Sequence, residues 1–263
     1  MQTQYTATVE SAYEKLLQAY KNKISIAPLT SNFPDLSIEE AYQIQMKFIE
    51  EKVKEGQKVV GKKIGLTSEA MQDLLGVDQP DYGHLLDAMQ LNEGEPIPLL
   101  YLFQPKVEAE IAFILESDLK GPDVTVEAVM NATAYVVPSL EIVDSRIQDW
   151  KITLPDTIAD NASSGMFIIG GKKVKPQEVN LTDIRMQLFK NGDFVNEGTG
   201  ADVLGDPAAC VAWLANKLSD YGVTLKAGEV ILSGALSAAV KVEKGDKITA
   251  SFTSLGDLES EVK

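Results

Sequence analysis

Three glutamates lie inside otherwise apolar segments, where their carboxylates are placed to bind a cation. Glu108 and Glu110 belong to KVEAEIAFIL, and Glu141 belongs to YVVPSLEIV. Both segments are rich in Val, Ile, Leu and Phe and are typical of strands, in which residues i and i+2 share a face. Glu108 and Glu110 therefore share a face with Ala112. We expect these charges to border the core, where desolvation is costly unless a partner compensates it.

A divalent cation would compensate the three carboxylates. Oxygen ligands of this kind suit Mg²⁺ or Mn²⁺. Zinc is disfavoured because the chain contains one Cys and one His, too few for the usual nitrogen and sulfur ligands. The alternative is that each glutamate faces water on an exposed strand, as single strand glutamates usually do. A pair at i and i+2 together with a third glutamate favours the metal site.

Two further charged residues are candidates for acid–base chemistry. Lys63 lies in GKKIGLTS, and a lysine beside apolar groups has a lowered pKa and can donate or accept a proton. Lys62 and Lys63 point to opposite faces of the predicted strand, so at most one of them should face the interior; the alternative is two surface lysines. Asp81 lies in the turn PDYG, where an aspartate usually hydrogen-bonds its own backbone.

A polar loop and two single residues complete the candidates. The loop DNASSG at 160–165 contains Ser163 and Ser164 and could bind a carboxylate or orient water, or simply cap a helix. His84 has no nucleophile-elbow motif near it, so we assign it no role. Cys210 falls on the apolar face of a predicted helix and is interpreted as a buried hydrophobic residue.

The composition restricts the class of protein. The chain has 263 residues, 44% of them hydrophobic, enough to form the core of a globular protein. A net charge of −15 with dispersed basic residues argues against nucleic acid as a partner. The sequence contains neither an apolar segment long enough for a membrane span nor a signal-peptide pattern at its start, and one cysteine fits a reducing compartment. We therefore expect a cytoplasmic protein that does not interact with membranes.

The pattern along the chain predicts an α+β protein. Residues 1–90 form a mostly helical N-terminal lobe, with helices over 9–23 and 37–55, the second one starting at a capping box of Ser37 and Glu40. Residues 91–263 contain strands with interspersed helices, including a hairpin at Asn191-Gly192 and a helix after Pro207. Because helices do not alternate regularly with strands, we expect a mainly antiparallel, curled sheet.

Several segments, taken in order, resemble one known enzyme family. The chain is similar to the 2-keto-4-pentenoate (vinylpyruvate) hydratases, which belong with the 4-oxalocrotonate decarboxylases in the fumarylacetoacetate hydrolase superfamily. The similarity lies in GKKIGLTS, GVDQPDYGHLLDAM, KVEAEIAFIL, PSLEIVDSRIQDWKI, DTIADNASSG, the helix with VAWLANKL, and KAGEVILSGAL. It implies a fumarylacetoacetate hydrolase-like curled mixed sheet, arranged as a β-roll or sandwich, and a homo-oligomer.

The same resemblance implies roles for the candidate residues. Glu108, Glu110 and Glu141 match the family's ligands for Mg²⁺ or Mn²⁺. Lys63 matches an acid–base group near the 2-oxygen of the substrate. Asp81 matches the residue that positions or deprotonates water, and Ser163 matches the serine of D-N-A-S.

The resemblance also implies a reaction, with an alternative. Asp81 and the segment GALS at 234–237 favour a hydratase that converts 2-hydroxypenta-2,4-dienoate to 4-hydroxy-2-oxopentanoate in aromatic meta-cleavage catabolism. Ala238 and Ala239 stand where hydratases of a longer dicarboxylic substrate have an arginine, although SAAV is closer to the decarboxylase sequence. The alternatives are a 4-oxalocrotonate (2-oxo-3-hexenedioate) decarboxylase and a non-catalytic partner subunit in complex with one.

Overall fold

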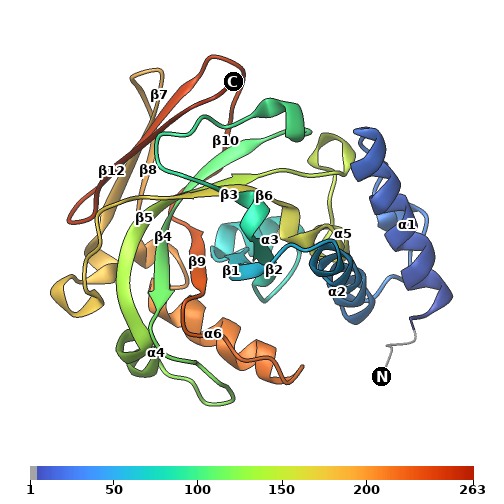
Figure 1. Ribbon diagram of the computed structural model, residues 1–263, viewed down its shortest axis with the longest axis horizontal. Coiled ribbons are helices and arrows are strands. Elements are labelled where there is room, and N and C mark those ends of the chain that lie inside the picture. Colours follow the sequence, from blue (N-terminus) through green and yellow to red (C-terminus); the bar gives the residue numbers. More distant parts are fainter. Residues whose placement is uncertain (1–4) are drawn as a thin grey trace.

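The computed structural model describes residues 5–263, apart from the side chains of residues 74 and 75. Figure 1 shows the long strands β4 and β5 curving through the molecule, with α1 and α2 on one side and β7, β8 and β12 on the other. The helices are α1 (Ala7–Asn22), α2 (Ile38–Lys54), α3 (Glu69–Leu75), α4 (Val126–Ala132), α5 (Leu154–Ala159) and α6 (Pro207–Ser219). The strands are β1 (Val59–Gly65), β2 (Asp81–Leu86), β3 (Gln90–Leu91), β4 (Lys106–Leu115), β5 (Thr133–Val143), β6 (Ser164–Ile169), β7 (Arg185–Lys190), β8 (Asp193–Thr199), β9 (Val230–Ala235), β10 (Val240–Lys241), β11 (Lys247–Phe252) and β12 (Gly256–Glu261).

Two sheets form the framework of the protein. The larger has eight strands in the order β2-β1-β9-β4-β5-β6-β3, with β10 pairing to β4. Its pairs are antiparallel except β1 with β9 and β3 with β6. The smaller sheet has the order β12-β11-β7-β8 and is antiparallel throughout. The predicted α+β class with a curled mixed sheet is confirmed.

Strand β4 is buried on both faces, as its composition suggests. Val107, Ala109 and Ile111 point into the main core, while Ala112 packs in a second cluster with Val137 of β5. Alternation of side chains along a strand produces this division. The candidate glutamates of β4 share a face with Ala112, so they border the second apolar cluster as expected.

Local signals in the sequence correctly mark several element ends. Ser37 and Glu40 form the capping box of α2, with the Ser37 hydroxyl accepting from the Glu40 amide. The turn at Asn191-Gly192 joins β7 to β8. Helix α6 starts at Pro207 after the cap Asp206, which accepts from the Ala208 amide.

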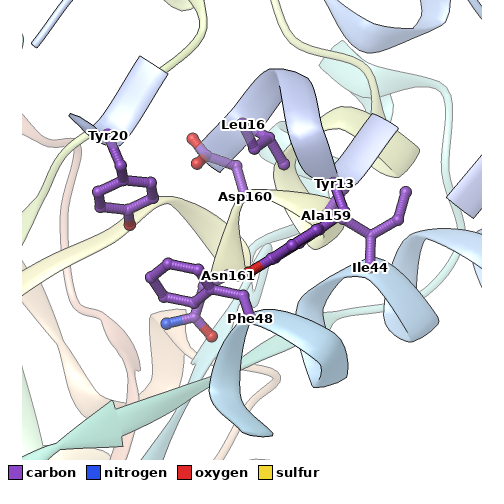
Figure 2. Close-up of a pocket in the computed structure, with 8 residues that line it drawn as sticks. All are labelled: Tyr13, Leu16, Tyr20, Ile44, Phe48, Ala159, Asp160 and Asn161. Carbon is purple, nitrogen blue, oxygen red and sulfur yellow. The ribbon is translucent and has the colours of Figure 1, made fainter. Parts of the chain in front are cut away.

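Helices α1 and α2 cover a small cavity of about 10 Å³, room for roughly one water molecule. Figure 2 shows that Asp160 and Asn161, from the turn after α5, join side chains of both helices in lining it. Among the described residues, no helix is long and apolar enough to cross a membrane. The domain boundary near residue 90 remains a prediction, and β1 and β2 of the first part pair within the sheet of the second.

Candidate metal centre and active site

The pairing of β4 with β5 brings the three predicted glutamates together. Glu108 lies directly opposite Glu141 in the antiparallel register, and Glu110 lies opposite Ser139, one step along the same face. Each glutamate offers one carboxylate oxygen, and these oxygens all lie within 4.8 Å of one another. Glu110 and Glu141 are buried, and Glu108 is half-buried.

The protein supplies few hydrogen-bond donors to the three carboxylates. The Gly234 amide donates to Glu110 Oε2 at 2.8 Å. The other oxygen of Glu110 and both oxygens of Glu141 are buried and have no hydrogen-bond partner in the described part of the chain. Buried carboxylate oxygens without donors are costly, and an oxygen-only set converging on one point fits a hard divalent cation.

Burial and mutual repulsion raise the pKa of each carboxyl group. Burial and the nearby Glu141 raise the pKa of Glu108 to about 7. The same two causes raise the pKa of Glu110 well above its ordinary value. Burial also raises the pKa of Glu141, although the Lys63 ammonium opposes it. A bound dication would reverse these shifts by favouring the ionised forms.

Lys63 lies next to the three glutamates, on β1. Its ammonium donates to the Ala162 carbonyl at 3.0 Å and lies 3.4 Å from Glu141 Oε1, an ion pair rather than a well-aligned hydrogen bond. Burial lowers the pKa of Lys63, but attraction by Glu141 and Asp81 outweighs it and raises the pKa overall. The sequence-based expectation of a lowered pKa is therefore wrong, because the neighbouring carboxylates belong to strands distant in sequence.

Lys62 is also buried, contrary to the expectation that at most one of the two lysines faces the interior. It points to the opposite face of β1 and pairs with Glu229 at 2.8 Å. This ion pair explains how a second lysine is tolerated inside the protein. Lys62 is separate from the candidate site.

Asp81 begins β2 and is 2% exposed, so it does not act as a solvent-exposed turn residue. Its Oδ2 accepts from Thr157 Oγ1 at 3.5 Å, while its Oδ1 has no hydrogen-bond partner among the described residues. Burial raises the pKa of Asp81, and Lys63 opposes the shift. Gly65 leaves the necessary room, because a Cβ there would lie 2.3 Å from Asp81 Oδ1.

The DNASSG loop reaches the site through an uncommon backbone turn. Asn161, Ala162 and Ser163 have φ angles of 54°, 50° and 54°, in the left-handed region that non-glycine residues rarely adopt. This turn directs the Ala162 carbonyl to Lys63 and places Ser163 Oγ 3.2 Å from Thr157 Oγ1. Ser164 Oγ is buried without a hydrogen-bond partner among the described residues.

Arg146 holds both ends of this turn, a role that sequence reasoning missed. Its Nε pairs with Asp160 at 2.5 Å, its Nη2 donates to the Asp160 carbonyl, and its Nη1 donates to the Ser164 carbonyl. The guanidinium also lies over the Tyr20 ring at 4.8 Å. The available signal was an arginine three residues after an apolar strand and an aspartate in DNASSG, but nothing local pairs the two.

A cavity of about 840 Å³ opens beside the glutamates. It is lined by site residues and by apolar side chains, including Lys63, Asp81, Glu108, Ser163, Thr157, Lys106, Trp150, Ile152, Leu236 and Ala238. Lys106, Trp150 and Thr157 were not singled out from the sequence. His84 lies outside the cavity lining, buried with its Nδ1 2.9 Å from Gln45 Oε1.

Comparison with known proteins identifies the fold and the family. The model for the fumarylacetoacetate hydrolase C-terminal region matches residues 84–263. The chain belongs to the fumarylacetoacetate hydrolase family. Among members, it is 45% identical to the 2-hydroxyhexa-2,4-dienoate hydratase of Comamonas testosteroni, over 94% of this chain and 95% of that protein. It is 50% identical to the 2-hydroxypent-2,4-dienoate hydratase of Pseudomonas putida, over 80% of this chain and 95% of that protein.

A solved structure of this family extends the comparison. The 4-oxalocrotonate decarboxylase of Pseudomonas putida G7, complexed with magnesium and adipate, superimposes with a TM-score of 0.95 and 36% identity over 100% of both chains. The resemblance noted in the sequence to hydratases and decarboxylases of this fumarylacetoacetate hydrolase family is thus confirmed.

Proposed function

We propose that this protein is a metal-dependent hydratase, a hydro-lyase that adds water to 2-hydroxypenta-2,4-dienoate to give 4-hydroxy-2-oxopentanoate in aromatic meta-cleavage catabolism. The observation that carries the proposal is the convergence of three carboxylates beside Lys63 and Asp81 at a cavity. The similarity to dienoate hydratases at 45% and 50% identity supports the same reaction class.

Glu108, Glu110 and Glu141 would hold Mg²⁺ or Mn²⁺. The unpartnered oxygens of the triad fit such an ion, and the similar decarboxylase was solved with magnesium. When bound, the ion supplies Lewis acidity toward the carboxylate and the 2-oxygen of the substrate. The buried setting strengthens that polarisation because little water competes with it.

Lys63 would hydrogen-bond the 2-oxygen as its proton leaves. In the first stage, the O–H proton of the dienol passes to water in the cavity and water delivers a proton to C5, giving a 2-oxo-3-enoate. An ammonium held by the Ala162 carbonyl and Glu141 is in place to donate a hydrogen bond to the 2-oxygen as negative charge develops there. The product carbonyl then withdraws electrons from C4.

Asp81 would activate the water that attacks C4. Its raised pKa makes it a stronger base than an ordinary aspartate, and its unpartnered Oδ1 is free to accept a proton from water. Hydroxide adds at C4 and a proton adds at C3, which balances the hydration. Thr157 and Ser163, whose hydroxyls lie 3.2 Å apart, would help to orient the water.

The decisive assay follows the loss of ultraviolet absorbance of the conjugated dienoate, with Mg²⁺ or Mn²⁺ and with chelator. Asp81→Asn should lower kcat by about 10²- to 10⁴-fold, as loss of a general base does. Asp87→Asn, at the exposed residue that follows β2, is the control and should leave the rate unchanged. A wild-type rate in Asp81→Asn would reject the role of Asp81.

A decarboxylase activity is the second candidate, favoured by the structural match to 4-oxalocrotonate decarboxylase. It would show as CO₂ release from 2-oxo-3-hexenedioate faster than dienoate hydration. We also propose a homo-oligomer in the cytoplasm, and association with a decarboxylase of this type. Co-elution of the two purified proteins in gel filtration tests that association.

A further inference from the structure

Lys106 is a cation at the cavity that the proposed chemistry has not used. It is the first residue of β4 and shares a face with Glu108 and Glu110 at i+2 and i+4. It is half-buried and lines the cavity. Within the part of the chain that the structure describes, no carboxylate lies within ion-pair distance of its ammonium.

The ammonium is held in place by an aromatic ring. Lys106 Nζ lies 4.1 Å from the ring centroid of Trp150, within the range of a cation–π interaction. The indole is fixed in turn, because Trp150 Nε1 donates to the Gln104 carbonyl at 3.1 Å. Asp149 and Trp150 both have left-handed φ angles, 58° and 55°. Such a backbone conformation is costly for large side chains and is concentrated at functional sites.

Two lysines lie near the carboxylates. Lys63 lies beside Glu141, whereas Lys106 precedes Glu108 by two residues on the same face of β4. The three glutamates and Asp81 carry four negative charges when ionised. Lys63 and a bound dication compensate three of them, so the site has a net charge of −1. An anionic substrate would be repelled from such a site, and Lys106 supplies the missing positive charge.

We propose that Lys106, supported by Trp150, binds the C1 carboxylate of the substrate and thereby fixes its orientation; this inference rests on the proposed function. A 2-oxo acid presents its carboxylate and its 2-oxygen side by side. Lys63, Lys106 and Asp81 line the same cavity, so with the 2-oxygen at Lys63 the carboxylate would lie toward Lys106 and the chain from C3 toward Asp81. Lys106 would therefore be a specificity residue for the carboxylate of the 2-oxo acid.

The test measures binding of a substrate analogue that cannot be hydrated. Calorimetry of the Mg²⁺-loaded protein gives the dissociation constants of 2-oxopentanoate and of its uncharged amide, 2-oxopentanamide. Lys106→Met should weaken 2-oxopentanoate binding by about 10- to 100-fold, as loss of a charged hydrogen bond does, and should leave the amide within threefold. Lys106→Arg should retain acid binding. Lys173→Met, which removes a cation–π lysine over Tyr135 outside the cavity, is the matched control.

A kinetic split and the metal affinity separate this role from a structural one. Because the carboxylate keeps its charge throughout the reaction, Lys106→Met should raise KM by about 10- to 100-fold with kcat within threefold. The Mg²⁺ dissociation constant should not rise. If Lys106→Met folds poorly, Lys106→Gln takes its place.

Three outcomes would overturn the inference: unchanged affinity for 2-oxopentanoate, equal loss for the acid and the amide, or weakened Mg²⁺ binding. The proposed function fails separately. If the wild-type protein binds the acid through Lys106 but does not hydrate the dienoate, the carboxylate subsite is supported and the proposed hydratase activity is wrong.

Discussion

Lowering the pH from 8 to 6 should weaken Mg²⁺ binding, because the cation must displace protons from the triad. The pKa of Glu108 is raised to about 7 by burial and by Glu141, and the same two causes raise the pKa of Glu110 well above its ordinary value. Metal ligands must be deprotonated, so every proton held in the metal-free state competes with the ion. The effect is specific to carboxylates that are crowded together.

The expected size follows from the titration. A group with a pKa of about 7 is roughly nine-tenths ionised at pH 8 and one-tenth at pH 6, so Glu108 alone raises the dissociation constant about tenfold. Glu110, whose pKa is also raised, changes the dissociation constant in the same direction. At a fixed Mg²⁺ concentration well above the dissociation constant, each tenfold rise in that constant removes about 1.4 kcal/mol of metal-induced stabilisation.

The metal-free protein should show the opposite trend. A carboxyl group whose folded pKa exceeds its unfolded value holds more protons when folded, so its contribution to stability is present at low pH and is lost as the pH rises through about 7. Mg²⁺ should therefore stabilise the protein little at pH 6 and strongly at pH 8.

The assay is urea unfolding at pH 6, 7 and 8, each with Mg²⁺ and with chelator, at constant ionic strength. Subtracting the two curves at each pH cancels groups remote from the metal, such as His84, whose pKa burial lowers to about 3, and Asp160, whose pKa burial raises to about 6. Glu108→Gln should flatten the pH dependence. A metal-induced stabilisation that is equal at pH 6 and 8, or larger at pH 6, would show that protons do not compete with Mg²⁺ for these carboxylates.

Three more predictions concern single side chains. Glu141→Gln should weaken Mg²⁺ binding by more than about 100-fold in calorimetry, which exceeds the loss on removing a residue that only hydrogen-bonds to a metal ligand. Retained affinity would exclude Glu141 as a ligand. Lys63→Met should lower kcat by about 10²- to 10⁴-fold, whereas Lys62→Met, on the opposite face of β1, should lower stability and spare kcat. Arg146→Met should lower the free energy of unfolding by about 3–5 kcal/mol, because it leaves Asp160 buried without its partner. A smaller loss of stability than in Lys62→Met would contradict the role of Arg146 in holding the turn.

The sequence allowed prediction of features that depend on short-range periodicity. Glu108 and Glu110 share a face because strands alternate, and this holds in any strand. The capping box of Ser37 and Glu40 and the hairpin at Asn191-Gly192 likewise depend on neighbours within a few residues. The convergence of Glu141 on this pair needed the register of β4 with β5, which spacing alone does not specify.

Features that depend on distant partners were predicted poorly. Lys62 is buried because Glu229, 167 residues away, pairs with it. The pKa of Lys63 is raised because β1 carries it to Glu141 and Asp81, so its charge environment comes from tertiary structure. Trp150 and Lys106 are 44 positions apart, and neither side chain by itself indicates a carboxylate subsite. Local sequence describes a side chain's chemistry but not the charges that surround it.

Two buried acidic groups of similar depth show why hydrogen-bond satisfaction distinguishes a structural role from a functional one. Asp160 accepts from the Arg146 side chain, the Arg146 amide and Ser145 Oγ, so its charge is compensated within the protein. Glu141 is equally buried, yet neither of its oxygens has a hydrogen-bond partner among the described residues. A compensated carboxylate stabilises a turn and needs nothing more. A carboxylate with one ion pair, to Lys63, and no hydrogen bond is retained where binding repays its desolvation, which is the physical reason for proposing Glu141 as a ligand and Asp160 as part of the scaffold.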